Sequence, residues 1–268
     1  MDHRSLKQAK LTINPVPDYN ATIPEYKNWY TEGKVSVPGN QLNCGSCWAF
    51  TATAVMESYS HLYGNDTTLQ QYSVQQLVDC DNEFQSGCSG GWMWQAYNYT
   101  KYYGIALKSV YPRAYANKQM KCAYDQNTMS YFKPDNMGMI EKDRNVNAVL
   151  KRLVSQHPVA IAMYAAGMMA KYKSGIMTED FLKCSSAAYE VNHGITLVGY
   201  GKVQRNDRVR GHCREYWIIR NSWGATWGEQ GTFRLCMDGV GTSNKPFGSC
   251  LVNKFATWPN FQGIIIEP

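Results

Sequence analysis

A cysteine between a polar turn and an apolar segment is the residue of this chain best suited to chemistry. Cys47 follows the turn at residues 41–46 and precedes an apolar run at residues 48–59, which is typical of a buried helix. The N–H groups in the first turn of a helix lack intrahelical partners and carry partial positive charge. They stabilise a thiolate, the nucleophilic form of cysteine. The sequence therefore predicts that Cys47 is a nucleophile.

Other roles for Cys47 are less favoured. Cys44 and Cys47 form a C-x-x-C pair, which occurs in redox enzymes and in structural zinc sites. A redox pair of the thioredoxin kind follows a strand, whereas residues 35–40 are rich in turn formers. A structural zinc site needs a second close pair, but Cys80 and Cys88 are eight residues apart. A purely structural, disulfide-bonded Cys47 is a third alternative. We expect no metal and no cofactor.

A base and an orienting group follow in two strand-like segments. His193 begins the apolar run 194–200, and Asn221 ends the run 216–221, close to Trp223. An imidazole beside the thiol can hold the thiolate as an ion pair and then protonate the leaving amine. An amide oxygen that accepts the other ring N–H fixes the tautomer of the imidazole. The other histidines, which we expect at the surface or in loops, are His3, His61, His157 and His212.

The order of these motifs resembles that of papain-family cysteine proteases, and of the cathepsin L group in particular. The likeness extends from about residue 23 to residue 259. It rests on residues 23–29 (IPEYKNW), 41–50 around Cys47, 76–81 (QLVDCD), 88–91 (CSGG), the His193 strand and 221–228 (NSWGATWG). The resemblance implies an α+β fold with two lobes, a helical left lobe and an antiparallel, β-barrel-like right lobe. The active site would lie in the cleft between them.

The resemblance assigns a catalytic role to four residues. Cys47 would be the nucleophile, His193 its acid/base partner and Asn221 the group that orients the imidazole. Gln41 stands six residues before Cys47, where the family has its oxyanion-hole glutamine. The Gln41 side-chain N–H and the Cys47 backbone N–H would bind the developing oxyanion. The implied function is a cysteine endopeptidase that acts through an acyl-enzyme intermediate.

The resemblance also implies a pocket for the substrate side chain two residues before the scissile bond (P2). Its floor would be Phe255, five residues after Cys250, or Ala256 if the register is shifted by one. Because no carboxylate faces inward, a cationic side chain would be desolvated there without a partner. We expect a hydrophobic P2 residue, Leu or Val rather than Arg, with Phe disfavoured if Phe255 fills the floor. The implied substrate-binding residues are Gly90, Gly91, Trp92, Met93, Ala162, Val191, Asn192, Gly194, Trp223, Trp227 and Phe255.

The spacing of the catalytic residues indicates an insertion. His193 lies 146 residues after Cys47, whereas Asn221 lies 174 residues after it. Family members place both partners roughly 130–150 residues downstream. The excess fits the charged segment 202–214, which we interpret as a solvated surface loop between two pairing strands.

The nine cysteines indicate four disulfides once the nucleophile is set aside. The resemblance implies the pairs Cys44–Cys88, Cys80–Cys122 and Cys184–Cys250. Cys213 precedes the strand-like run 216–221, and Cys236 ends the run 231–235. A hairpin of these strands would bring the two sulfurs together, so we expect a fourth bond, Cys213–Cys236.

Cysteine usage and glycosylation sequons favour an oxidising compartment. Three Asn-X-Thr sequons occur, at Asn20, Asn65 and Asn98, and Asn65 is the best glycan candidate because it follows Gly64 in a turn. With the disulfides they indicate a lysosomal, vacuolar or secreted protein. Since no apolar run reaches 18 residues, we expect no membrane span.

Composition and periodicity give the organisation of the chain. With 268 residues and 44% hydrophobic residues, the chain can form one large domain or two lobes. We expect residues 1–22 to be a propeptide remnant or N-terminal extension and residues 23–268 a peptidase domain. Its helical lobe would span about 30–135 and its β-rich lobe about 136–259, with terminal segments crossing over. Expected helices are 48–63, 73–80, 93–103 and 145–155, and expected strands are 159–164, 194–200, 216–221 and 231–235.

The expected partners are protein or peptide substrates, the chain's own propeptide and cystatin-like inhibitors, and the protein itself would be a monomer. The net charge of +6 is scattered along the chain, without a basic stripe interleaved with aromatic residues, so nucleic-acid binding is not expected.

Two further functions are less favoured by the sequence. A catalytically silent relative would usually lack the cysteine or the histidine, and an exopeptidase needs an element that blocks the cleft, such as a histidine-containing loop. Residues 81–87 contain no histidine, so an endopeptidase is favoured.

Overall fold

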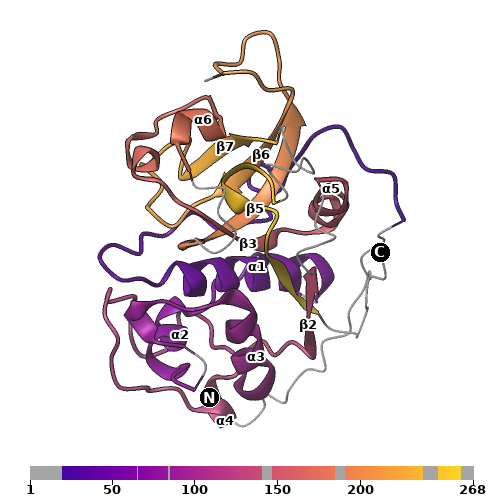
Figure 1. Ribbon diagram of the computed structural model, residues 1–268. Coiled ribbons are helices and arrows are strands. Elements are labelled where there is room, and N and C mark those ends of the chain that lie inside the picture. The colour runs from indigo at the N-terminus through magenta and orange to yellow at the C-terminus, as the bar shows by residue number, and fades with distance from the viewer. Residues whose placement is uncertain are drawn as a thin grey trace.

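The computed structural model describes residues 20–64, 66–83, 85–140, 147–184, 191–209, 211–237 and 247–260. A helical part lies below a sheet part, and the long helix α1 runs between them (Figure 1). The helices are α1 (Cys47–Tyr63), α2 (Val74–Cys80), α3 (Met93–Tyr103), α4 (Gln126–Met129), α5 (Asn147–Gln156) and α6 (Glu179–Leu182). The strands are β1 (Lys27–Asn28), β2 (Asn136–Ile140), β3 (Val159–Met163), β4 (Ile176–Met177), β5 (His193–Lys202), β6 (Glu215–Arg220), β7 (Thr232–Cys236) and β8 (Ala256–Asn260).

The strands form one sheet in the order β2-β8-β3-β5-β6-β7-β4, and β1 pairs with β5. All pairs are antiparallel except β4 with β7. β5 has a register shift between Leu197 and Gly199. A Cβ atom on Gly199 would lie 2.0 Å from the carbonyl oxygen of Lys27, so only glycine lets β1 approach here. The α+β class expected from the sequence is confirmed.

Helix α1 is buried on nearly all sides, from Trp48 through Ser60. A helix that is apolar all round belongs in the interior of a protein, and α1 contacts both α3 and β5. The Trp48 indole N–H donates to the carbonyl of Gly87 at 3.1 Å. The predicted helix at 48–63 is therefore present, with one more residue, Cys47, at its start.

Four disulfides connect the chain. They are Cys44–Cys88, Cys80–Cys122, Cys184–Cys250 and Cys213–Cys236. The ninth cysteine, Cys47, is free. The pairing is the one that the sequence led us to expect, so the only thiol of the chain is the candidate nucleophile.

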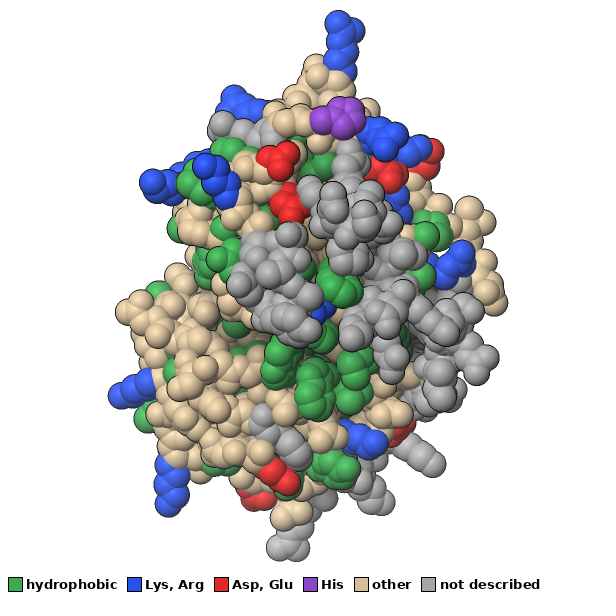
Figure 2. Space-filling view, in the orientation of Figure 1, with side chains coloured by type: hydrophobic (Ala, Val, Ile, Leu, Met, Phe, Trp, Pro, Cys, Tyr) green, Lys and Arg blue, Asp and Glu red, His purple; other side chains and the backbone are tan. Residues whose placement is uncertain are grey.

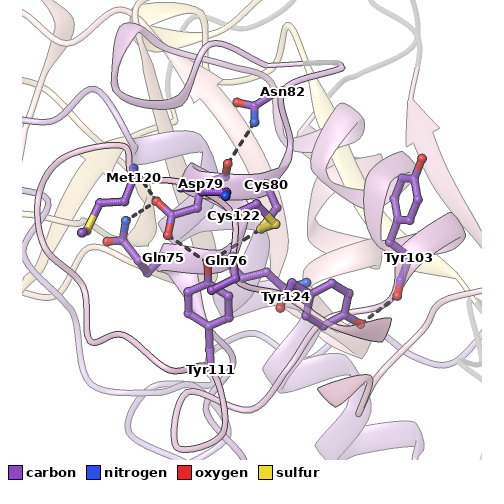
Figure 3. Close-up of a disulfide and its surroundings, with 12 residues drawn as sticks. Gln75, Gln76, Asp79, Cys80, Asn82, Tyr103, Tyr111, Met120, Cys122 and Tyr124 are labelled. Atoms are coloured by element: carbon purple, nitrogen blue, oxygen red, sulfur yellow. Dashed lines mark hydrogen bonds between the residues drawn. A yellow bond between two sulfur atoms is a disulfide. The ribbon is translucent and has the colours of Figure 1, made fainter. Parts of the chain in front are cut away.

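The Cys80–Cys122 bond lies beside a buried carboxylate that fixes a long loop on α2 (Figure 3). Asp79 accepts hydrogen bonds from the Tyr111 hydroxyl at 2.9 Å and from the Met120 N–H at 2.7 Å. It also accepts from the Gln75 amide at 2.7 Å. Tyr111 and Met120, at two separate places in this loop, are thus both attached to α2.

The segment 202–214 is largely the solvated loop expected from its charges, because most of its described residues are exposed and none is buried. Asp207 forms an ion pair with Arg234 of β7 at 2.6 Å. The carbonyl of Arg208 accepts the N–H of Ile176 at 2.8 Å. These two contacts attach the loop to the edge of the sheet, which the sequence did not predict.

The described histidines outside β5 agree with the expected surface or loop positions only in part. His61 lies in the last turn of α1 and is half-buried. His157 does lie in the connection between α5 and β3, but its side chain is fully buried against Tyr59 and Trp258. Burial lowers the pKa of His157 to about 4, so its imidazole is neutral near neutral pH. His212 is exposed, and His3 lies outside the described residues.

Charged side chains are dispersed over the face shown in Figure 2. Lys and Arg lie mainly toward its edges, and Asp and Glu lie in the upper half and near the lower edge. Hydrophobic side chains gather in the middle of this face. The described side chains thus form no continuous basic stripe on it.

The Cys213–Cys236 bond should contribute measurably to stability. It closes a segment with a sequence separation of 23 residues. Removing it with Cys213→Ser and Cys236→Ser together should lower the free energy of unfolding by about 3 kcal/mol, because the unfolded chain gains entropy. Denaturant unfolding of both proteins checks this. Equal unfolding free energies would contradict it.

Candidate active site

The first turn of α1 meets the start of β5. Cys47 is the first residue of the helix and His193 the first residue of the strand. The backbone N–H of Gly194 donates to the Cys47 sulfur at 3.4 Å. A Cβ atom on Gly194 would lie 2.9 Å from the sulfur of Met93. The absence of a side chain at Gly194 therefore leaves room for Met93 of α3 beside the strand.

The imidazole of His193 is oriented by Asn221, which directly follows β6. The Asn221 side-chain oxygen lies 2.7 Å from His193 Nε2 and also accepts the N–H of Ser222 at 2.8 Å. Asn221 is 1% exposed, and the Trp223 ring lies 5.2 Å from the imidazole. Because Nε2 is held by Asn221, Nδ1 is the nitrogen available to Cys47.

At Cys47 and His193, burial and the attraction between the two charges shift each pKa in opposite directions. Burial acts to raise the pKa of Cys47, but the hydrogen bond and charge of His193, with the N–H groups of Gly194 and Trp48, lower it overall. Burial acts to lower the pKa of His193, yet Cys47 and Asn221 raise it above its ordinary value. Both shifts favour a thiolate–imidazolium pair.

Gln41 lies in a turn that is attached to the residue after Asn221. Its backbone N–H donates to the Ser222 carbonyl at 2.8 Å, and the Ser222 hydroxyl donates to Gln41 Oε1 at 2.6 Å. Gln41 Nε2 then donates to the Cys44 carbonyl at 3.0 Å. Leu42 adopts a left-handed φ of 52°, which costs a non-glycine residue roughly 1–2 kcal/mol. The neighbouring contacts must therefore hold the turn in shape.

The glycines at 90 and 91 play different roles. Gly90 has a φ of 117°, and its carbonyl accepts the Ser86 N–H at 3.2 Å. A Cβ atom on Gly91 would lie 2.8 Å from the Trp48 ring. Within the described residues, neither the N–H nor the C=O of Gly91 has a protein hydrogen-bond partner. Gly91 is thus the one of the two whose N–H and C=O both lack a partner there.

Several of the expected pocket residues lie together. Ala162 of β3 pairs with Gly194 of β5, and Met93 lies against Gly194. The Phe255 ring lies 5.2 Å from that of Trp92. Ala256, by contrast, is fully buried within β8. Phe255 is thus the residue that faces Trp92.

The remaining expected residues lie around these groups. Val191 packs against the hydrophobic core. The Asn192 amide accepts the N–H of Ala165 at 2.7 Å and donates to its carbonyl at 3.3 Å. Trp223 and Trp227 pack edge to face at 5.1 Å, on the side of Asn221.

Three residues near the site were not among those expected. Ser222 holds the Gln41 amide oxygen, and its place after Asn221 in the NSWG motif was a usable signal. The hydroxyls of Ser46 and Tyr115 lie 2.7 Å apart beside Cys47. No sequence pattern pointed to Tyr115, because it is in a loop far along the chain.

The glycosylation sequons differ in accessibility. Asn20 is exposed, and Asn98 is half-buried on α3. Asn65 lies outside the described residues. Asn20 is therefore the more accessible of these two candidates for glycosylation.

Within the described ranges, no three His, Cys, Asp or Glu side chains lie close enough together to hold a metal ion. None of the helices in the described part of the chain is long and apolar enough to cross a membrane.

Comparisons with known proteins agree with this geometry. Residues 23–259 match the family described as papain family cysteine protease. The oryzain gamma chain of Oryza sativa subsp. japonica is 36% identical over 81% of this chain and 56% of its own length. A cathepsin L-like proteinase of Fasciola hepatica is 35% identical over 82% of this chain and 63% of its own length. The chain thus spans less than two thirds of these relatives.

A solved structure has the same fold. The bromelain protease from Ananas comosus, in complex with the E64 inhibitor, superposes with a TM-score of 0.73 and 30% sequence identity. The match covers 90% of this chain and 100% of the bromelain chain. The family match spans most of the chain and includes the paired Cys47 and His193. This chain therefore belongs to the papain family of cysteine proteases.

Proposed function

We propose that the protein is a cysteine endopeptidase with Cys47 as nucleophile and His193 as acid/base. The observation that carries this proposal is the Cys47–His193 pair, whose pKa shifts favour the thiolate and the imidazolium. Asn221 supports it by orienting the imidazole through a 2.7 Å hydrogen bond.

The reaction follows from these groups. The Cys47 thiolate attacks the carbonyl carbon of the scissile peptide, and the C=O electrons move to its oxygen. The imidazolium of His193 protonates the leaving amine as the C–N bond breaks, which gives a thioester acyl-enzyme. Water then attacks the thioester while neutral His193 accepts its proton. The thiolate leaves and the pair is restored.

An oxyanion site beside Cys47 supports this mechanism. The backbone N–H of Cys47 lies in the first turn of α1, where N–H groups have no intrahelical partner. The Gln41 carboxamide carries two N–H bonds, so Nε2 can donate to an oxyanion while it also binds the Cys44 carbonyl. Losing one donor of this kind typically costs about 100- to 1000-fold in rate.

The proposed substrate-binding residues are the expected ones. Gly91 would pair with the backbone of an extended substrate, since its N–H and C=O have no partner within the described residues. Trp92, Met93, Ala162, Gly194 and Phe255 would line the P2 pocket. The Lys254 ammonium lies 5.1 Å from the centre of the Phe255 ring.

The wider biological setting is also a proposal. Four disulfides fit an oxidising compartment, so we propose a lysosomal, vacuolar or secreted monomer that cleaves proteins or peptides. Its propeptide and cystatin-like inhibitors would occupy the same cleft as the substrate.

Cys47→Ala should fold normally and hydrolyse no peptide substrate, because no other cysteine is free. In the wild-type protein, iodoacetamide should modify one residue and abolish activity. Mass spectrometry counts the modified residues, and hydrolysis of a fluorogenic dipeptidyl amide measures the activity. The matched control is Cys213→Ser/Cys236→Ser, which lacks two cysteines distant from the nucleophile and should remain active when folded. Turnover by Cys47→Ala would refute the mechanism.

The kcat/KM profile of the wild-type protein should be bell-shaped in pH. Activity needs the thiolate, so it rises as pH passes the lowered pKa of Cys47. It also needs the imidazolium, so it falls as pH passes the raised pKa of His193. Asn221→Ala removes one cause of that increase and should move the alkaline limb to lower pH. An unshifted alkaline limb in this variant would contradict the role of Asn221.

Substrates with Leu or Val at P2 should be cleaved better than those with Arg or Phe. Apolar walls leave an Arg side chain desolvated without a partner, and the Phe255 ring leaves little depth for Phe. Phe255→Ala should therefore raise kcat/KM for a substrate with Phe at P2. The kcat/KM for a substrate with Leu at P2 should change less. Efficient cleavage of the Arg substrate by the wild-type protein would show that the pocket has been assigned wrongly.

A further inference from the structure

The hydroxyl of Tyr115 lies between the two parts of the oxyanion site. It donates to the backbone carbonyl of Gln41 at 2.8 Å and lies 2.7 Å from the hydroxyl oxygen of Ser46. Gln41 and Ser46 stand on either side of the turn that precedes Cys47. One side chain thus contacts both ends of this turn.

The direction of the Ser46 hydrogen bond follows from proton counting. A tyrosine hydroxyl has a single proton, and that of Tyr115 is used on Gln41. Ser46 must therefore donate its own proton to Tyr115.

This arrangement changes what Ser46 does for the helix. A serine immediately before a helix usually accepts an N–H of the first turn, but Ser46 makes no such side-chain cap. Such a cap takes the N–H of the second or third helical residue, so the N–H of Trp48 is left for the Cys47 thiolate.

Tyr115 is held in place independently of the turn. Gln75 on α2 accepts the N–H of Ala116 at 2.8 Å and donates to the Lys118 carbonyl at 2.9 Å. The ring of Tyr115 packs edge to face on Phe50 at 4.8 Å. Figure 3 shows the base of this loop, where Gln75 binds Asp79 beside the Cys80–Cys122 bond. The hydroxyl is therefore presented from a fixed support.

We propose that Tyr115 is a positioning residue for the oxyanion site, an inference that rests on the proposed peptidase function. Its hydrogen bonds fix the position of the Gln41 turn relative to the first turn of α1, so that Gln41 Nε2 and the Cys47 N–H both point to the oxyanion. Tyr115 acts through these groups and does not touch the substrate.

Tyr115→Phe tests the proposal because it removes the hydroxyl and keeps the ring against Phe50. Its kcat/KM on a peptide amide should fall about 10-fold, less than for loss of an oxyanion donor itself. A peptide aldehyde forms a tetrahedral adduct with the same oxyanion, so its inhibition constant should weaken by the same factor. Alkylation by iodoacetamide attacks no carbonyl, and its rate should stay close to that of the wild type.

Tyr124→Phe is the matched control. Its hydroxyl donates to the Tyr103 carbonyl at 2.7 Å and lies on the same chain segment (Figure 3), so activity and aldehyde affinity should not change. Ser46→Ala, which removes the other partner of Tyr115, should weaken aldehyde binding in the same direction. It provides the test if Tyr115→Phe fails to fold.

The outcomes separate the inference from the proposed function. Wild-type protein without peptidase activity would refute the function. Active wild-type protein with unchanged aldehyde affinity in Tyr115→Phe would overturn the positioning role. Equal losses in hydrolysis and in alkylation would overturn it as well, since the hydroxyl would then act on the thiolate or on general stability.

Discussion

The close approach of α1 to β5 is the constraint on which the site depends. Cys47 and His193 are far apart in the chain, and they meet because β5 packs against α1, where the Gly194 N–H donates to the Cys47 sulfur at 3.4 Å. Burial opposes the charge on each group taken alone. The two charges are favourable only together, at a distance where their attraction exceeds the cost of desolvation. A displacement of β5 from α1 would therefore separate the two charges and favour the neutral thiol of Cys47.

A buried network of hydrogen bonds supports the contact between α1 and β5. Arg220, which precedes Asn221, donates to the carbonyls of Ser36 and Val37 at 3.0 and 3.1 Å. The Ser36 hydroxyl donates to Glu57 of α1 at 2.5 Å, and burial raises the pKa of that carboxyl. The network connects β6, the segment before Gln41 and α1. Removing one partner would leave a buried polar group unsatisfied, which is costly.

The sequence predicted the parts of the structure that follow from periodicity and from spacing. Helix α1 was predicted from its apolar run, and β5 and β6 were predicted from theirs within two residues. The Cys213–Cys236 pair was predicted from a hairpin, and the structure contains both the hairpin and the bond.

Contacts between distant loops were not predictable in the same way. The hydroxyl of Tyr115 reaches Gln41 across 74 residues of sequence, and no local pattern encodes such a meeting. The charges of the segment 202–214 predicted its exposure, but not the ion pair of Asp207 with Arg234. Burial of His157 likewise depends on Tyr59 and Trp258, which are remote from it in sequence.

The central claim is that His193 makes Cys47 a thiolate. Ultraviolet absorbance of the thiolate, followed during a pH titration, tests it directly because Cys47 is the only free thiol. The wild-type signal should persist well below the ordinary pKa of cysteine, and His193→Ala should move its midpoint upward. A wild-type thiol that titrates at the ordinary value, or a midpoint that His193→Ala leaves unchanged, would contradict the claim.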